Sequence, residues 1–162
     1  MFHIPSTEQL DTDSLYGDIT SLIASVTSDE PNLIANLANS ASVLFHMLPN
    51  VNWAGFYLLL DDELVLGPFH GKPACVRIAI GRGVCGTAAA ERRTVVVPNV
   101  GEFPGHIACD SASMSEIVVP LMKDNRLIGV LDIDSPVQDR FSLVDAQHLE
   151  RIVELLVSRS TA

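Results

Sequence analysis

The sequence predicts one α+β domain in which helices pack on a largely antiparallel sheet of about six strands. Helical patterns lie at both ends of the chain, and short segments rich in aliphatic and aromatic residues fill its middle. Turn residues separate several of these segments, which is typical of antiparallel hairpins. A length of 162 residues suits a single domain. We therefore expect one domain over 1–162, with a helical extension over 1–30 and a core over 31–160.

Two helices are expected before the sheet. Residues 7–27 carry a weak helical pattern, which Gly17 interrupts. Ser28 or Asp29 is placed to cap the second helix, with Pro31 in its first turn. An apolar stripe at helical spacing then defines this second helix. The stripe consists of Leu33, Leu37, Ala41, Leu44 and Leu48.

The rest of the chain predicts the sheet, a long loop and a last helix. Residues 98–115 contain glycine and proline but no hydrophobic period, and loops of that length are usually functional or disordered. Pro120 lies inside a strand and indicates an edge or a bulge. Ser142 and Asp145 are spaced for a capping box at the start of the last helix. The expected strands are 52–60, 63–69, 75–80, 94–97, 116–122 and 126–134, with a short helix over 84–92.

The charge and hydropathy of the chain exclude some classes of partner. Its 20 acidic residues and 10 Lys and Arg give a net charge of -10, so it would repel nucleic acid. The longest apolar stretches, such as 117–122, are too short to cross a bilayer. Residues 1–9 lack the basic and apolar segments of a secretory signal, so we expect a cytoplasmic protein. Charged residues make up only 19% of the chain. This low content leaves two possibilities open: a second subunit covers part of the apolar surface, or the monomer buries its apolar residues in its own core.

The cysteines, Cys75, Cys85 and Cys109, are an odd number for a disulfide framework. They lack the C-x-x-C spacing of a zinc ribbon. His106 and Cys109 would make half of a metal site, for which the sequence offers no second half. A cysteine in such a chain is most often a small buried hydrophobe.

Local context distinguishes two of these cysteines. Cys85 lies at the N-terminal turn of the expected 84–92 helix, a position that lowers a thiol pKa and binds carboxylates through backbone N–H groups. Cys109 lies in the long loop, and a mobile loop can carry a nucleophile onto a substrate. The pattern alone does not choose between them.

Acidic residues occur inside an apolar strand. Asp132 and Asp134 share a face with Ile128 and Val130, although aspartate is depleted in strands. Glu116 begins the partner strand of this hairpin, at the same end of the pair. These acids are either solvated at the strand end or clustered, so that mutual repulsion leaves one carboxyl protonated near neutral pH. Such a cluster would hold an ammonium group and supply a proton.

Two aromatic residues, Trp53 and Tyr57, lie on one face of the first expected strand, with Gly55 between them. Such pairs usually belong to a core. The glycine also suggests a gap between the rings that a thioether methyl group would fill.

These segments together resemble one family, the free methionine-(R)-sulfoxide reductases, which are built on a GAF domain. The resemblance runs from about Asn32 to the C-terminal helix and includes every cysteine. Generic GAF domains share the fold and the Gly-Val-Leu strand but do not generally share these cysteines and acids. The segments that carry the resemblance are NWAGFY at 52–57, LGPF at 66–69, GKPAC at 71–75, GRGVCGTA at 81–88, GHIACD at 105–110 and GVLDIDS at 129–135.

The resemblance implies an enzyme that reduces free L-methionine-(R)-S-oxide to L-methionine. Cys109 would attack the substrate and become a sulfenic acid. Cys75 would then form a disulfide with it, which thioredoxin reduces. Cys85 matches a third cysteine with an accessory or alternative resolving role. The family needs no metal and no organic cofactor, and it is usually dimeric, so we expect a homodimer.

The resemblance also assigns the acids and the aromatic pair. Glu116, Asp132 and Asp134 match the acids that hold the substrate ammonium and help to protonate the sulfoxide oxygen. Trp53 and Tyr57 match the wall around the methyl-sulfur end of the substrate. The alternative is a GAF module without catalysis, which binds a small molecule or senses redox state through a disulfide.

Overall fold

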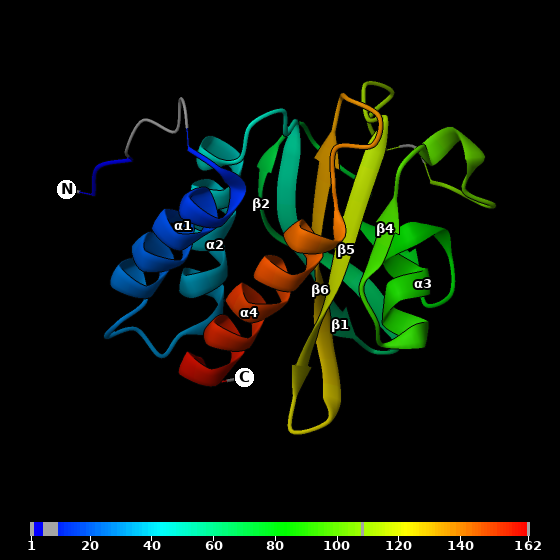
Figure 1. Ribbon diagram of the computed structural model, residues 1–162. Coiled ribbons are helices and arrows are strands. Elements are labelled where there is room, and N and C mark those ends of the chain that lie inside the picture. The colour runs from blue at the N-terminus through cyan, green and yellow to red at the C-terminus, as the bar shows by residue number, and fades with distance from the viewer. Residues whose placement is uncertain (1, 5–9, 108, 162) are drawn as a thin grey trace.

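The computed structural model describes residues 2–4, 10–107 and 109–161. Its centre is a six-stranded sheet with the order β3-β2-β1-β6-β5-β4, in which every neighbouring pair is antiparallel. Figure 1 shows α1, α2 and α4 on one face of this sheet and α3 on the other. The predicted α+β class is therefore confirmed. The elements are α1 (Thr12–Val26), α2 (Leu33–Met47), β1 (Trp53–Leu60), β2 (Glu63–Gly71), β3 (Arg77–Ala79), α3 (Gly83–Glu91), β4 (Val95–Val97), the 3-10 turn η1 (Val100–Glu102), β5 (Ser115–Lys123), β6 (Arg126–Ser135) and α4 (Leu143–Arg159).

Each face of the sheet has its own apolar cluster. The larger cluster packs α1, α2 and α4 on the sheet, with Tyr16, Leu37 and Phe56 fully buried. Burying a side chain of this size contributes about 2 kcal/mol each. The smaller cluster lies under α3, whose buried side chains are small, Val84 and Ala88 among them. No helix in the described ranges is long and apolar enough to span a membrane.

Strand register brings polar side chains together on the face that α3 covers. Glu116 of β5 pairs with Asp134 of β6. Trp53 of β1 pairs with Asp134, and Gly55 pairs with Asp132. Residues that lie opposite each other in antiparallel strands point to the same face. Three central strands therefore carry the predicted acids and Trp53 to one area of the sheet.

The first helix differs from its prediction. Helix α1 begins at Thr12, because the Asp11 carboxylate caps it by accepting from the Ser14 backbone N–H at 3.0 Å. Residues 7–9 of the predicted helix lie outside the described part of the chain. Gly17 does not interrupt the helix. It is exposed, and no atom lies where its Cβ would be, so it costs only about 1 kcal/mol of helix propensity.

The predicted cap of the second helix is wrong. Asn32, not Ser28 or Asp29, caps α2, accepting from the Ala35 backbone N–H at 3.0 Å. Pro31 therefore precedes the cap instead of lying in the first turn. Asparagine is among the strongest N-cap residues, and its amide oxygen suits the extended backbone found there.

Pro120 is accommodated because β5 is an edge strand at that point. The short strand β4 pairs with β5 only from Glu116 to Val118. Beyond Val118, β5 pairs with β6 alone, and the register shifts between Leu121 and Met122. A proline, which lacks the backbone N–H, therefore removes no bond to β4 there.

The capping box at the start of α4 is confirmed. The Ser142 hydroxyl accepts from the Asp145 N–H at 3.2 Å, and the Asp145 carboxylate accepts from the Ser142 N–H at 2.7 Å. We expect Ser142→Ala to lower the free energy of unfolding by about 1 kcal/mol, because it leaves a helix N–H without its acceptor. Urea unfolding measures this loss as a lower midpoint. Ser158→Ala, an exposed change near the other end of α4, is the matched control and should move the midpoint little; equal losses in both variants would contradict the assignment.

Candidate active site

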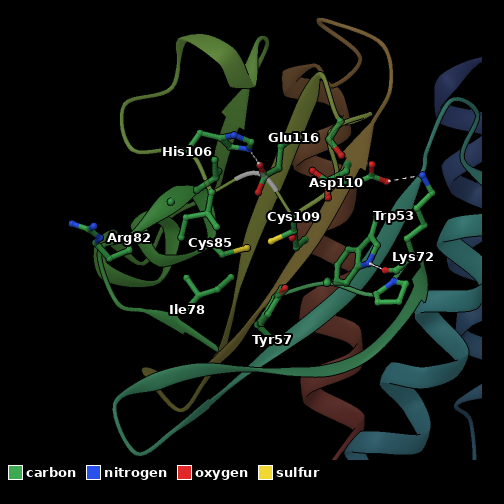
Figure 2. A pocket seen from close by; sticks show the side chains of 18 residues that line it. Trp53, Tyr57, Lys72, Ile78, Arg82, Cys85, His106, Cys109, Asp110 and Glu116 are labelled. Atoms are coloured by element: carbon green, nitrogen blue, oxygen red, sulfur yellow. Dashed lines mark hydrogen bonds and ion pairs between the residues drawn. The ribbon is translucent and has the colours of Figure 1, made fainter. Parts of the chain in front are cut away.

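A cavity opens on the α3 face of the sheet, above the cluster of acids. Strands β1, β5 and β6 form its floor, and the start of α3 forms one side. Two connecting segments complete its rim (Figure 2). The first contributes Lys72, Pro73 and Ala74, and the second contributes His106, Ile107, Cys109, Asp110 and Ser113. The predicted site residues that line it are Trp53, Tyr57, Cys85, Cys109, Glu116, Asp132 and Asp134.

A disulfide joins the two rim segments. It links Cys75, just before β3, to Cys109 in the long loop, with 5.8 Å between their Cα atoms. Cys75 is half-buried and Cys109 is exposed. Cys109, in the long loop, is thus bonded to Cys75, and Cys85 is free. The cavity behind the disulfide has a free volume of about 30 Å³, which is room for about two water molecules.

The aromatic pair holds the segment that carries Cys75. The Trp53 indole N–H donates to the Lys72 carbonyl oxygen at 3.0 Å, and the Tyr57 hydroxyl donates to the Cys75 carbonyl oxygen at 3.0 Å. Both side chains are buried, and buried Trp and Tyr usually satisfy their polar atoms in this way. The pair therefore fixes the backbone on both sides of Pro73 and Ala74, a role that the sequence did not indicate.

The predicted gap beside Gly55 is wrong. A Cβ at position 55 would lie 2.6 Å from the Trp53 ring carbon Cη2 and would also overlap Phe69. The Trp53 ring stacks on Phe69 with 5.3 Å between centroids. Glycine at this position therefore makes room for the protein's own rings, and the space is already filled.

The loop segment that carries Cys109 is anchored at the next residue. The Asp110 carboxylate accepts from the Ala112 N–H at 2.9 Å and from the Asn52 side-chain amide at 3.4 Å. It also forms an ion pair of 3.6 Å with Lys72, whose side chain is largely exposed. These contacts were not predicted. The sequence signal was the presence of an aspartate in a loop. The side chain of such a residue often accepts from the backbone N–H two residues further on, which forms an Asx turn.

The predicted acids are clustered and buried. Glu116 is 6% exposed and Asp132 is 7% exposed, while Asp134 is half-buried. Burial raises the pKa of all three carboxyls well above its usual range, and their mutual repulsion adds to this effect. The alternative of solvated turn acids is therefore wrong. His106, from the loop, lies 3.4 Å from the Glu116 carboxylate, and burial lowers its pKa, which favours the neutral imidazole.

The environment of Cys85 contradicts the expectation of a lowered thiol pKa. Cys85 does lie in the first turn of α3, but it is only 4% exposed. Burial raises the pKa of this thiol well above its usual value, and the nearby Asp132 and Glu116 raise it further. Desolvation and repulsion by carboxylates thus outweigh the helix N-terminus. Cys85 is therefore a poor nucleophile in this form of the protein.

The burial of Cys85 predicts its reactivity. We expect the folded, disulfide-bonded protein to react with an aqueous aromatic disulfide reagent at least about 100-fold more slowly than the unfolded protein. After unfolding in guanidinium, one thiol per chain should react, since two of the three cysteines are bonded. Absorbance of the released thiolate measures both rates. Rapid reaction of one thiol in the folded protein at neutral pH would contradict the buried position of Cys85.

The buried acids predict a pH-dependent stability. Consider a carboxyl whose pKa is higher in the folded protein than in the unfolded chain. As the pH rises from the unfolded pKa to the folded pKa, the free energy of unfolding that this group contributes falls. Glu116→Gln removes this effect. Relative to the wild type, the variant should therefore gain about 1 kcal/mol or more in unfolding free energy between about pH 5 and about pH 8. Urea unfolding at each pH tests this. Glu154→Gln, which changes an exposed carboxylate on α4, is the control. Parallel pH profiles for the wild type and Glu116→Gln would count against the buried cluster.

Comparison with known proteins identifies the family of this chain. The GAF domain family matches residues 31–159. The free methionine-R-sulfoxide reductase of Escherichia coli (strain K12) is 52% identical over 141 residues, which cover 87% of this chain and 86% of that protein. This chain is also similar to the crystal structure of a free methionine-R-sulfoxide reductase from Neisseria meningitidis in complex with its substrate. The identity there is 48% and the TM-score 0.92, over 98% of this chain and 95% of that one.

A third relative, fRMsr of Staphylococcus aureus in its reduced form, is 51% identical with a TM-score of 0.87, over 98% of this chain and 99% of that one. The resemblance first noted in the cysteine and acid motifs thus extends over nearly the whole fold. The chain belongs to the free methionine-R-sulfoxide reductases, a family of oxidoreductases built on the GAF domain.

Proposed function

We propose that this protein reduces free L-methionine-(R)-sulfoxide to L-methionine by a thiol mechanism. The name of the E. coli relative and the substrate complex of the N. meningitidis relative support the substrate. The observation that carries the mechanism is the Cys75–Cys109 disulfide at the rim of a cavity with carboxyls on its floor. Such a disulfide is the expected end state of one reductive turnover.

The cavity offers a partner for each charged group of a free amino acid. Glu116, Asp132 and Asp134 are suited to the substrate ammonium, which would stabilise their ionised forms. Gly83 and Val84, at the start of α3, also line the cavity, and the residue before them makes no side-chain cap. Backbone N–H groups of such a helix start bind carboxylates. A peptide-bound methionine sulfoxide has neither charge, so both contacts select the free amino acid.

The chemical steps balance without a metal or an organic cofactor. The Cys109 sulfur attacks the sulfoxide sulfur, and the oxygen receives a proton from the acid cluster. The oxygen then passes to Cys109: its bond to the methionine sulfur breaks, a bond to the Cys109 sulfur forms, and methionine leaves. Cys109 becomes a sulfenic acid, and the proton of its thiol replaces the one that the acid cluster gave up. The Cys75 thiol then attacks the Cys109 sulfur, which forms the disulfide and releases water. A dithiol reductant, for which we propose thioredoxin, exchanges with this disulfide and restores both thiols.

Reduction of the disulfide would also open the site. The free volume of about 30 Å³ is far too small for methionine sulfoxide. The loop that carries Cys109 is held to the opposite rim by the disulfide and by the Lys72–Asp110 ion pair, in which the lysine is largely exposed. An exposed ion pair contributes at most about 1 kcal/mol, so the disulfide is the stronger of the two restraints.

The proposed assembly is a cytoplasmic homodimer, consistent with exposed apolar side chains such as Leu143 and Val76.

Two cysteine variants separate the steps. Cys109→Ser should lower turnover by roughly 10³-fold or more, because the attacking sulfur is lost. Cys75→Ser should still release one methionine per chain in a single turnover. Further turnover with thioredoxin as the reductant should then stop, because the sulfenic acid lacks its resolving thiol. Chromatography of released methionine measures both. Normal turnover by Cys109→Ser would contradict the assigned nucleophile, and normal thioredoxin-dependent turnover by Cys75→Ser would contradict the assigned resolver.

Thiol counting distinguishes this enzyme from a GAF module that does no chemistry. Reduced protein, freed of reductant, should lose two thiols and release about one methionine per chain on addition of the sulfoxide. A module that only binds a small molecule would lose none. A redox sensor would lose two thiols with peroxide but release no methionine from the sulfoxide.

A further inference from the structure

Three side chains that line the cavity present a set of metal-binding donor atoms. The Cys85 sulfur and one carboxylate oxygen each from Glu116 and Asp132 all lie within 4.8 Å of one another. All three residues are buried. Figure 2 shows the Cys85 sulfur and the Glu116 carboxyl on the same side of the cavity, with His106 above them. The donors come from α3, β5 and β6, so the fold itself holds them together.

A second observation points to a ligand at this position. The Oδ1 atom of Asp132 is buried and has no hydrogen-bond partner among the described residues. Asp132 is 93% buried, given its exposure of 7%, and it lines the cavity. Leaving a buried carboxylate oxygen without a partner costs about 1–3 kcal/mol. A cation bound between these side chains would satisfy this oxygen.

We propose that Cys85, Glu116 and Asp132 form a binding site for one divalent transition-metal cation, of the Zn²⁺ class, in the disulfide-bonded protein. One sulfur and two oxygen donors match Zn²⁺ and Co²⁺, whereas Ca²⁺ and Mg²⁺ prefer oxygen alone. Donors of a tetrahedral zinc site lie about 3.5 Å apart. Since these atoms lie within 4.8 Å of one another, they need to approach by at most about 1.3 Å. The free volume of about 30 Å³ also accommodates a bound water as fourth ligand.

The charges of the site favour a cation of this kind. Each donor that binds the ion releases its proton to solvent, so a thiolate, two carboxylates and a divalent ion leave a net charge of -1. The ion thus removes most of the repulsion that the ionised side chains would suffer without it. His106, 3.4 Å from Glu116, provides a nitrogen donor beside the site. This inference does not depend on the proposed reaction, because it concerns the oxidised form, which does not react with the sulfoxide.

Co²⁺ is the probe, and the oxidised protein is the sample. Since Cys75 and Cys109 are bonded, Cys85 is the one thiol per chain, and a thiolate-to-cobalt absorption band identifies it directly. We expect one Co²⁺ per chain and a band that Zn²⁺ displaces. Cys85→Ser should lose the band, and Asp132→Asn should bind Co²⁺ at least about 10-fold more weakly. Because the band is read in the wild type, this part of the test does not depend on whether a variant folds.

The matched control is a pair of surface histidines. His46 and His70 lie with ring centroids 4.7 Å apart, and two adjacent imidazoles could bind the same ions. His46→Gln should leave the cobalt band and its affinity unchanged. Zn²⁺ at about 100 times its dissociation constant should also raise the melting temperature of the oxidised wild type by roughly 5–10 °C. Absence of the band in the wild type at about 1 mM Co²⁺, unchanged affinity in Cys85→Ser, or loss of binding in His46→Gln would each overturn the proposal.

Discussion

The burial of three carboxyl groups on one sheet face is the constraint on which the rest of this structure depends. Antiparallel register places Glu116 opposite Asp134, with Asp132 on the same face. An isolated buried carboxylate is unstable, so each group retains its proton to a higher pH or finds a cation. In the proposed reaction, such a site would hold the substrate ammonium group and supply a proton to the sulfoxide oxygen.

The same burial determines what the cysteines do. Cys85 lies against the acids and is kept as a neutral thiol, because both burial and negative charge oppose its ionisation. Cys75 and Cys109 lie at the rim, where the solvent is close, and they form the disulfide. The disulfide thus lies at the rim of the cavity, and the acids lie on its floor.

Much of the fold could be predicted from local patterns. The hairpins, the capping box of α4 and the location of the acids at one strand end all follow from alternation and turn residues within short segments. The cap of α2 was predicted at the wrong residue because Ser28, Asp29 and Asn32 are chemically similar candidates. Which cysteines bond is a property of the folded chain, and here the family resemblance, not the spacing, indicated Cys75 and Cys109.

The site details that sequence analysis missed are all contacts between distant segments. The Lys72–Asp110 ion pair joins two loops whose approach no periodicity encodes. Gly55 suggested open space, yet the space is occupied by Trp53 from the same strand and Phe69 from its neighbour. The thiol pKa of Cys85 was expected from the helix start alone. Burial in the folded protein, and then the carboxyls of β5 and β6, raise it instead.

The hydroxyl of Tyr57 has one further consequence for how the two sulfurs separate and rejoin. Because it holds the backbone at Cys75 to a strand in the middle of the sheet, one end of the disulfide is tied to the rigid part of the domain. In the proposed reaction, the movement that breaks and re-forms that bond would therefore fall on the Cys109 side. Cys75 would stay in place, so the two sulfurs would meet again at the same position in each cycle.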